Sequence, residues 1–388
     1  MRAADFTQDS PGQLVPTIGM QQAFVPAPLP PKIDLNDIGL SMADAMQAIG
    51  ELKGACRRLP SPYILIRPLQ RREALTSSAM EGTFTTADNL VLAEAGIDRN
   101  DDDATKEVRN YLRALDESLI LLDSLPICHR VIKTAHEILL GGLSSARGAQ
   151  KRPGQYKFDQ NWIGGRLIEN ARFVPPPPTE TQQCMDAVER YINREPSPYP
   201  TALMDLALVH YQLETIHPFA DGNGRVGRML ISIMAVKTGL LEMPVLYVSP
   251  ALEHDKDLYI DLMYAVSTRG EWVPWLNFFF EKVQVACRDT ISTIDRLIDL
   301  QDNYRQSAGA AARSANAISL VDSLFQRPVL TVMKAAEILS VTYAAAKKTI
   351  DKLVDLQILV EVPGLHPKTF LAKGVMDAAT PQDQPSDG

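Results

Sequence analysis

Apolar residues recur at helical spacing along most of the chain, so the pattern predicts a mainly helical protein. Positions three and four residues apart lie on one face of an α-helix, and such apolar runs alternate with short polar breaks. An aromatic stretch at 271–280 is expected to be buried packing between helices rather than a binding site. The predicted helices lie at 35–59, 103–125, 126–140, 179–192, 202–216, 226–236, 255–265 and 283–303.

Three segments depart from this periodicity. Residues 1–34 contain prolines but few periodic apolar positions, so we expect an extended Pro-rich arm that wraps the body. Residues 154–165 place Tyr156, Phe158 and the bulky pair at 162–163 between glycines, which predicts a short β-hairpin. The proline run at 175–178 is expected to be a stiff connector.

The C-terminal part, 304–375, is expected to be a linker followed by a second module. Over 328–373 a helix, a tight turn, a second helix and two short strands are typical of a winged helix-turn-helix. Residues 327–375 have a net charge of only +3, and the alanines at 344–346 supply no donors that could distinguish bases. DNA binding, protein docking and dimerisation therefore all stay open. Residues 376–388 are expected to form a disordered tail.

The composition of the whole chain narrows the class of protein. Its 388 residues, with 45% hydrophobic and 22% charged content, are typical of a soluble globular protein of two or three domains. The N-terminus lacks a signal-peptide pattern and the apolar runs are too short to span a membrane, so we expect a cytoplasmic protein. A net charge of −8 argues against broad nucleic-acid binding, and four widely spaced cysteines argue against a zinc site or disulfide framework.

Residues 217–228, with the sequence HPFADGNGRVGR, concentrate polar chemistry in one turn and the start of a helix. The glycines and asparagine at 222–224 allow a tight turn whose N–H groups face an anion at the helix N-terminus. Arg225 and Arg228 can hold phosphate oxygens, and Asp221 is a carboxylate of the kind that binds Mg²⁺. His217 is the one group in this segment that is suited to proton transfer near neutral pH. The segment therefore predicts a polyphosphate site with a base beside it.

This segment resembles the Fic-domain signature HPFx[DE]GNGRxxR at every fixed position. The resemblance implies an all-α Fic fold with a small β-hairpin flap. It also implies that AMP is transferred from ATP to a Ser, Thr or Tyr hydroxyl of the protein itself or of a target protein. His217 would be the base, Asp221 would hold Mg²⁺, and ATP would be bound by Gly222, Asn223, Gly224, Arg225 and Arg228. Some Fic relatives that act as kinases carry Lys at the position of Gly224, so Gly224 favours AMP transfer.

Further residues are assigned through the same resemblance. Tyr259 and Leu262 lie where Fic proteins shape the adenine pocket. His210, His129 and His136 are instead expected to be core histidines.

A second motif lies upstream, at Ser77 to Gly82. Its sequence, SSAMEG, resembles the [ST]xxxE[GN] inhibitory motif of autoinhibited Fic proteins. We expect a helix over 68–82 that begins at Pro68 and ends at Gly82, with Ser77 and Glu81 on one face. Glu81 would pair with Arg228 in the place of the ATP γ-phosphate and misalign the nucleotide. In some relatives this glutamate also assists AMP removal, which leaves a reversible enzyme open.

The segment 154–165 then resembles the Fic flap. The edge of its predicted hairpin would hold a target segment by strand addition, with Trp162, Ile163 and Gly164 as the docking residues. The family often has Arg at the position of Lys157, which puts that single contact in doubt.

The resemblance divides the chain into a helical region at 35–125 and a catalytic core at 126–303. One alternative is a DNA-binding transcriptional regulator that uses the core as a nucleotide sensor. The intact His217 argues against it, because sensing requires no base. Transfer of another nucleotide or of phosphocholine is a second alternative. The identity of the target protein and the formation of a homodimer also stay open.

Overall fold

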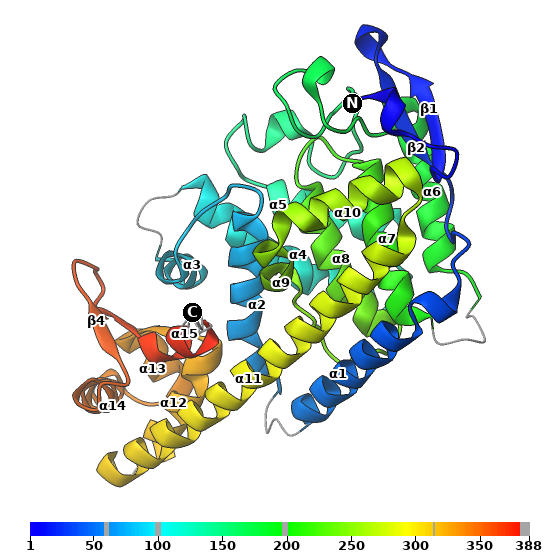
Figure 1. Cartoon of the computed structure of the whole chain (residues 1–388). Coiled ribbons are helices and arrows are strands. Elements are labelled where there is room, and N and C mark those ends of the chain that lie inside the picture. The colour runs from blue at the N-terminus through cyan, green and yellow to red at the C-terminus, as the bar shows by residue number, and fades with distance from the viewer. Residues whose placement is uncertain (58–61, 98–101, 196–200, 313–314, 381–388) are drawn as a thin grey trace, which may run out of the picture.

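Two adjacent helices, α7 (Ala202–Ile216) and α8 (Asn223–Lys237), form the buried centre of the molecule (Figure 1). The computed structural model describes residues 1–57, 62–97, 102–195, 201–312 and 315–380. Most residues of both helices are buried, as expected for helices that are surrounded by packing partners. The prediction of a mainly helical fold is confirmed. Helices that pack against this pair include α1 (Gly39–Arg57), α4 (Asp103–Leu121), α5 (His129–Leu140), α6 (Pro178–Ile192), α10 (Lys256–Arg269) and α11 (Trp272–Ala312).

The helix α11 is longer than its amphipathic pattern predicted. It includes the aromatic stretch at its start and continues through the expected linker to Ala312, instead of covering 283–303 alone. Trp275, Phe279 and Phe280 are fully buried, so the prediction of interhelical packing is confirmed. α1 runs along α11, as Figure 1 shows.

The helix that carries the first residues of the predicted inhibitory motif is also longer than expected. α2 spans Pro62–Ala79, so Pro68 lies inside the helix and not at its first position. Proline removes one backbone donor, but Ile66 and Leu69 are buried on either side of it, and tertiary packing of this kind supplies most helix stability in proteins. α2 contacts α3 (Ala87–Glu94), α9 (Ser249–His254), α4 and α8.

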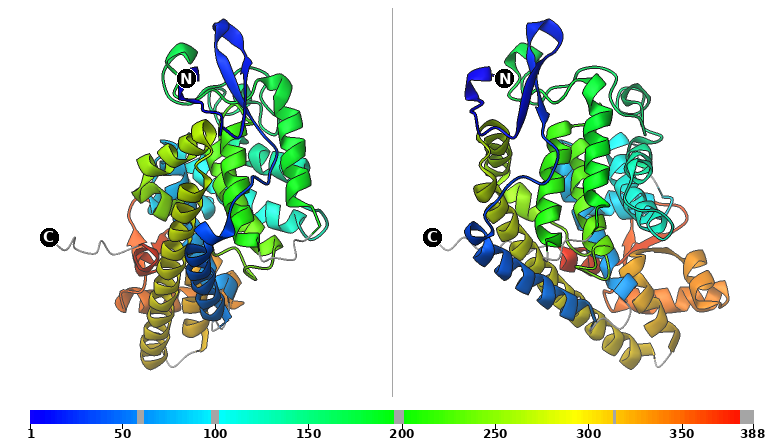
Figure 2. Two further views of the ribbon diagram at one scale, coloured as in Figure 1. Left: turned by 45° about the vertical axis from the view of Figure 1, so that its right-hand side comes forward. Right: turned by 90° about the vertical axis from the view of Figure 1, so that its right-hand side faces the viewer.

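The N-terminal arm is not simply extended. It forms a two-stranded antiparallel sheet of β1 (Gly12–Pro16) and β2 (Gln22–Pro26), with Gly12 opposite Pro26. The prolines at 16 and 26 end the strands and so leave the ladder between them intact. Phe24 is fully buried and its N–H donates to the carbonyl of Val174, which ties the hairpin to the segment near residue 170 (Figure 2). Single-turn 3-10 helices flank the strands at Ala3–Asp5, Ile18–Met20 and Leu35–Asp37.

The prediction of a β-hairpin at 154–165 is wrong. No strand forms within this segment, and its one β-bridge joins Ile163 to Phe173, outside the predicted range. Gly164 and Gly165 both have positive φ values, so the chain turns where a strand would have to continue. Short 3-10 helices precede and follow the segment, at Ala149–Lys151 and Ile168–Asn170.

The C-terminal module contains the predicted helices and strands. A three-stranded antiparallel sheet, in the order β3-β5-β4, packs beside two helices joined by a short turn. Its designation as a winged helix-turn-helix stays a prediction. Its elements are α12 (Ala315–Gln326), β3 (Val329–Thr331), α13 (Val332–Leu339), α14 (Tyr343–Asp355), β4 (Val360–Val362), β5 (Thr369–Leu371) and α15 (Lys373–Ala379).

Two predicted boundaries of this module need correction. α12 occupies much of the expected linker and packs against α2. α15 extends into the expected tail, where Met376 and Ala379 are buried, and it packs against α11 and α2. Only 381–388 of that predicted tail lie outside the described residues.

Within the described ranges, no helix combines the length and apolar character needed to cross a membrane.

Candidate active site

His217 begins the site, immediately after the last residue of α7. Its backbone has φ 48° and ψ 59°, a left-handed conformation that is uncommon for residues other than glycine. The ring Nδ1 lies 3.2 Å from the carbonyl oxygen of Glu214. A carbonyl can only accept, so Nδ1 carries the proton and Nε2 is left as the basic nitrogen.

The environment of His217 keeps its imidazole neutral. Burial, and then the nearby cation of Lys157, lower the pKa of His217 to about 4. The residue is therefore an unprotonated base throughout the neutral range, as proton abstraction requires.

The loop between His217 and α8 is fixed by its own side chains. Asn223 accepts from the N–H of Phe219 at 2.8 Å and donates to its carbonyl at 3.0 Å. His136 stacks on Phe219, with ring centroids 3.8 Å apart, and bonds to the carbonyl of Asp221. Gly222 has φ 77° and forms the N-cap of α8, whose N-terminus follows. The Asn223 side chain thus holds the loop at Phe219, and the binding of ATP by Asn223 stays a prediction.

The predicted inhibitory contact is present in the structure. Arg228 is 2% exposed and its Nη2 donates to Glu81 Oε1 at 2.8 Å. The same guanidinium donates to Ser77 twice, to Oγ at 2.9 Å and to the carbonyl at 2.8 Å. Burial alone would raise the pKa of the Glu81 carboxyl, but Arg228 brings it below its ordinary value, so Glu81 is an anion. Glu81 itself lies in the turn that follows α2, and Gly82 ends this turn with φ 78°.

Glu81 also covers the N-terminus of α8. A Cβ atom placed on Gly224 would collide with Glu81 Oε1 and approach Arg228 Nη1 to 2.9 Å. A carboxylate therefore occupies the space where the helix N-terminus favours an anion. The absence of a side chain at 224 is what allows this approach.

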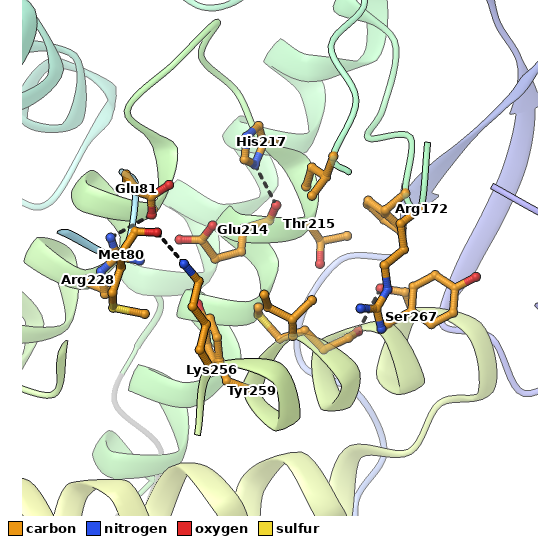
Figure 3. Close-up of a pocket in the computed structure, with 16 residues that line it drawn as sticks. Met80, Glu81, Arg172, Glu214, Thr215, His217, Arg228, Lys256, Tyr259 and Ser267 are labelled. Carbon is orange, nitrogen blue, oxygen red and sulfur yellow. Dashed lines mark hydrogen bonds and ion pairs between the residues drawn. The ribbon is translucent and has the colours of Figure 1, made fainter. Parts of the chain in front are cut away.

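A cavity of about 270 Å³ joins these groups (Figure 3). His217, Arg228 and Glu81 line one part of it, and α10 contributes a largely apolar part. The remaining lining residues include Met80, Ile163, Arg172, Phe173, Glu214, Thr215, Gly224, Lys256, Tyr259, Ile260, Met263, Tyr264 and Ser267.

Of the two residues predicted to shape the adenine pocket, only Tyr259 lines the cavity. Tyr259 is buried and lines the cavity, and its hydroxyl lies 2.9 Å from Nε2 of His210. Leu262 does not line the cavity, because it packs against the hydrophobic core, and Ile260 and Met263 take its place. His210 is a buried core histidine, as predicted, and burial lowers its pKa to about 3.

Arg225 does not line the cavity that receives Arg228. Its guanidinium is 3% exposed and forms an ion pair with the equally buried Glu107 of α4. It also donates to Asp221 Oδ1 at 3.2 Å. Two carboxylates thus bind Arg225 in this structure, and its contact with ATP stays a prediction.

Two residues of the cavity were missed by sequence analysis. Lys256 Nζ donates to the carbonyl of Met80 at 2.6 Å and so holds the turn that carries Glu81. Glu214 is partly buried, and desolvation raises its pKa to about 7. An acidic residue in the last turn of α7, directly before His217, was a signal for Glu214, whereas nothing local marked Lys256.

Comparison with known proteins agrees with this geometry. The Fic/DOC family model matches residues 126–235, and the Fic/DOC N-terminal model matches residues 40–119. These two segments of the chain are Fic/DOC family domains. A Fic family protein from Desulfovibrio desulfuricans has a similar structure, with a TM-score of 0.57 and 19% identity over 89% of this chain and 98% of that one. Fic-1 from C. elegans has a TM-score of 0.51 and 18% identity over 66% of this chain and 74% of that one. The prediction of a Fic fold is confirmed.

Curated relatives of this Fic chain are named protein adenylyltransferase Fic. The protein from Drosophila sechellia is 28% identical over 205 residues, which are 51% of this chain and 38% of the relative. The protein from Drosophila yakuba is 29% identical over 205 residues, which are 51% of this chain and 37% of the relative. The match thus spans less than two fifths of the length of these relatives.

The Fic flap residues lie beside the cavity. Ile163 lines it and pairs through its backbone with Phe173, while Trp162 and Gly164 flank this bridge. The N–H of Ile163 donates to Phe173 at 2.8 Å, so this backbone donor is already used within the chain. The role of these three residues in holding a target stays a prediction.

The Fic chain offers Asp221 for a magnesium ion. Its carboxylate is 44% exposed and accepts from the N–H of Gly222 at 2.6 Å. The part of the chain that the structure describes contains no group of three His, Cys, Asp or Glu side chains that could hold a metal ion by themselves. Magnesium is commonly bound by one or two carboxylates together with substrate phosphates, and a single exposed carboxylate fits this mode.

Proposed function

We propose that this Fic chain is an autoinhibited protein adenylyltransferase that transfers AMP from ATP to a hydroxyl of itself or of a target protein. One observation carries the proposal: a neutral, partly buried imidazole, the N-terminus of α8 and the guanidinium of Arg228 line one cavity. A phosphate at the helix N-terminus would lie beside a base that can activate an incoming hydroxyl. The names of the curated relatives support the same reaction.

The chemistry requires one proton transfer and one displacement at phosphorus. The hydroxyl oxygen attacks the α-phosphorus, a new oxygen–phosphorus bond forms, and the bond to the leaving pyrophosphate breaks. His217 Nε2 accepts the hydroxyl proton while Nδ1 stays bonded to Glu214. Asp221 would hold Mg²⁺, which when bound neutralises charge on the phosphates.

Inhibition follows from the position of Glu81. Its carboxylate pairs with Arg228 and lies over Gly224, where a terminal phosphate of ATP would otherwise interact. Two anions cannot share this space, so ATP binds in the productive orientation only when Glu81 withdraws.

The position of the labelled phosphate in ATP distinguishes AMP transfer from phosphate transfer. Incubation of the Glu81→Gly variant with magnesium and ATP labelled at the α-phosphate is expected to label protein, because the α-phosphorus stays with the product. ATP labelled at the γ-phosphate is expected to leave protein unlabelled. Gel autoradiography and intact-mass spectrometry measure both, and γ-label on the protein would instead indicate a kinase.

The pH dependence of the released enzyme follows from the lowered pKa of His217. A base functions in its deprotonated form, so lowering its pKa from 6.5 to about 4 extends activity toward acid. The Glu81 anion raises this pKa, so its removal shifts the value further down and not back. For Glu81→Gly, we expect kcat/KM for ATP to stay near its maximum at pH 6. A steady fall below pH 7, with a midpoint near 6.5, would contradict the assignment.

A further inference from the structure

Two side chains of the flap segment hold the backbone on which His217 sits. Asn161 Nδ2 donates to the carbonyls of His217 and Phe219, both at 3.0 Å. Lys157 Nζ donates to the carbonyl of Ile216 at 3.1 Å, and the backbone N–H of Lys157 donates to Pro218 at 2.8 Å. Four consecutive carbonyls, 216–219, are thus bound from the same short segment.

The two side chains also bind each other. Lys157 Nζ donates to Asn161 Oδ1 at 2.7 Å, which fixes the amide so that its NH₂ group faces the loop. Lys157 is only 6% exposed, an uncommon environment for a lysine. Its burial is compensated by hydrogen bonds to the fixed acceptors of Ile216 and Asn161. The acceptors of the Lys157 ammonium group thus come from its own segment and from the loop that carries His217.

The backbone at His217 needs the support of these hydrogen bonds. His217 has a left-handed conformation without being a glycine, and such a conformation persists only where surrounding contacts determine it. The hydrogen bonds on both sides of residue 217 supply those contacts. Without them, the peptide can relax to a more common conformation and carry the imidazole away from its position.

We propose that Lys157 and Asn161 are positioning residues that hold the His217 imidazole in its productive place, in addition to any role of the flap in target docking. The inference rests on the proposed function, because it concerns the base of that reaction. Neither side chain needs to touch the nucleotide, and neither lines the cavity that contains His217 and Arg228.

The charge of Lys157 adds an electrostatic effect to this geometry. The groups that act on His217 are Lys157 from the flap, Glu214 from α7 and Glu81 from the turn after α2. Lys157 lowers the pKa of His217, whereas the Glu214 carbonyl and Glu81 raise it. Burial lowers the pKa of Lys157 itself to about 7, and Cys184 of α6 acts on this pKa in the opposite direction. Replacing Lys157 by a neutral side chain therefore raises the pKa of His217.

The test compares variants in the Glu81→Gly background of the full chain. We expect Lys157→Met to lower kcat for AMP transfer about 10- to 100-fold, because a small misplacement of a reacting group has effects of this size. ATP affinity, measured by calorimetry, should change less than threefold. The acid limb of the kcat/KM profile should move to higher pH. Lys157→Arg can donate to the same acceptors and should recover most of the lost kcat.

A second variant and a control keep the test decisive. Asn161→Asp has the same shape but replaces the donor to two carbonyls by an acceptor, so it should lower kcat even if Lys157→Met does not fold. Lys348→Met, at an exposed position of α14, should leave kcat and the pH profile unchanged. Melting temperatures identify variants that are merely unstable.

The outcomes separate the two proposals. If Glu81→Gly itself transfers no AMP, the proposed function fails. If Glu81→Gly is active, the comparison concerns the positioning role alone. That role is overturned, while the proposed function stands, if Lys157→Met and Asn161→Asp fold and keep the kcat and the acid limb of Glu81→Gly.

Discussion

Replacement of Glu81 by glycine is expected to raise the rate of AMP transfer roughly 10- to 100-fold, since a charge-assisted hydrogen bond contributes about 1.5–3 kcal/mol and each 1.4 kcal/mol is a factor of ten. The substitution removes the carboxylate that pairs with Arg228 and covers Gly224. Incorporation of α-labelled AMP into the protein, measured as an initial rate at saturating ATP and magnesium, gives the comparison with the native chain.

Charge and size of the Glu81 side chain can be separated. Glu81→Gln keeps the size but loses the charge, so its rate should lie between those of the native chain and Glu81→Gly. Glu337→Gln makes the same substitution at an exposed glutamate of α13 and should change nothing. Equal initial rates for the native chain and Glu81→Gly would show that the contact with Arg228 does not limit the reaction.

Replacement of His217 by alanine has the second large effect. In the Glu81→Gly background it should lower AMP transfer about 100- to 10,000-fold, which is the usual contribution of a general base. ATP binding should change little, because Arg228 and the N-terminus of α8 remain. Fixed-time assays with α-labelled ATP measure the loss of AMP transfer, and calorimetry measures the retained binding of ATP.

A matched substitution controls for nonspecific effects. His254→Ala removes a histidine whose side chain is 83% exposed and should leave the rate unchanged. If His217→Ala were to keep the activity of its parent, another group would have to accept the proton, and the assignment of the base would be wrong.

The features that sequence predicted correctly are local ones. The segment 217–228 specifies its turn, its helix start and its polar groups within twelve residues, and α7 spans 202–216 as predicted. The pairing of Glu81 with Arg228 joins residues 147 positions apart, and no local pattern predicts it. It was expected only because two motifs resembled parts of one family.

The errors arise where tertiary contacts decide the local structure. Pro68 resembles a helix start, but packing of α2 carries the helix through it. The alternating aromatic residues after Gly154 resemble a hairpin, but the side chains of Lys157 and Asn161 hold that segment to another loop. The ion pair of Arg225 with Glu107, a residue more than a hundred positions away in sequence, likewise has no signal in the local pattern.

Glu81 lies beyond the last residue of α2, in a turn of three residues that ends at Gly82. Its movement away from Arg228 therefore requires only a local rearrangement of this turn and of the Lys256 contact to Met80, while the helix itself stays folded. Local openings of this kind need far less free energy than global unfolding. Under the proposed function, the resting rate of AMP transfer would therefore depend on how often these few residues move.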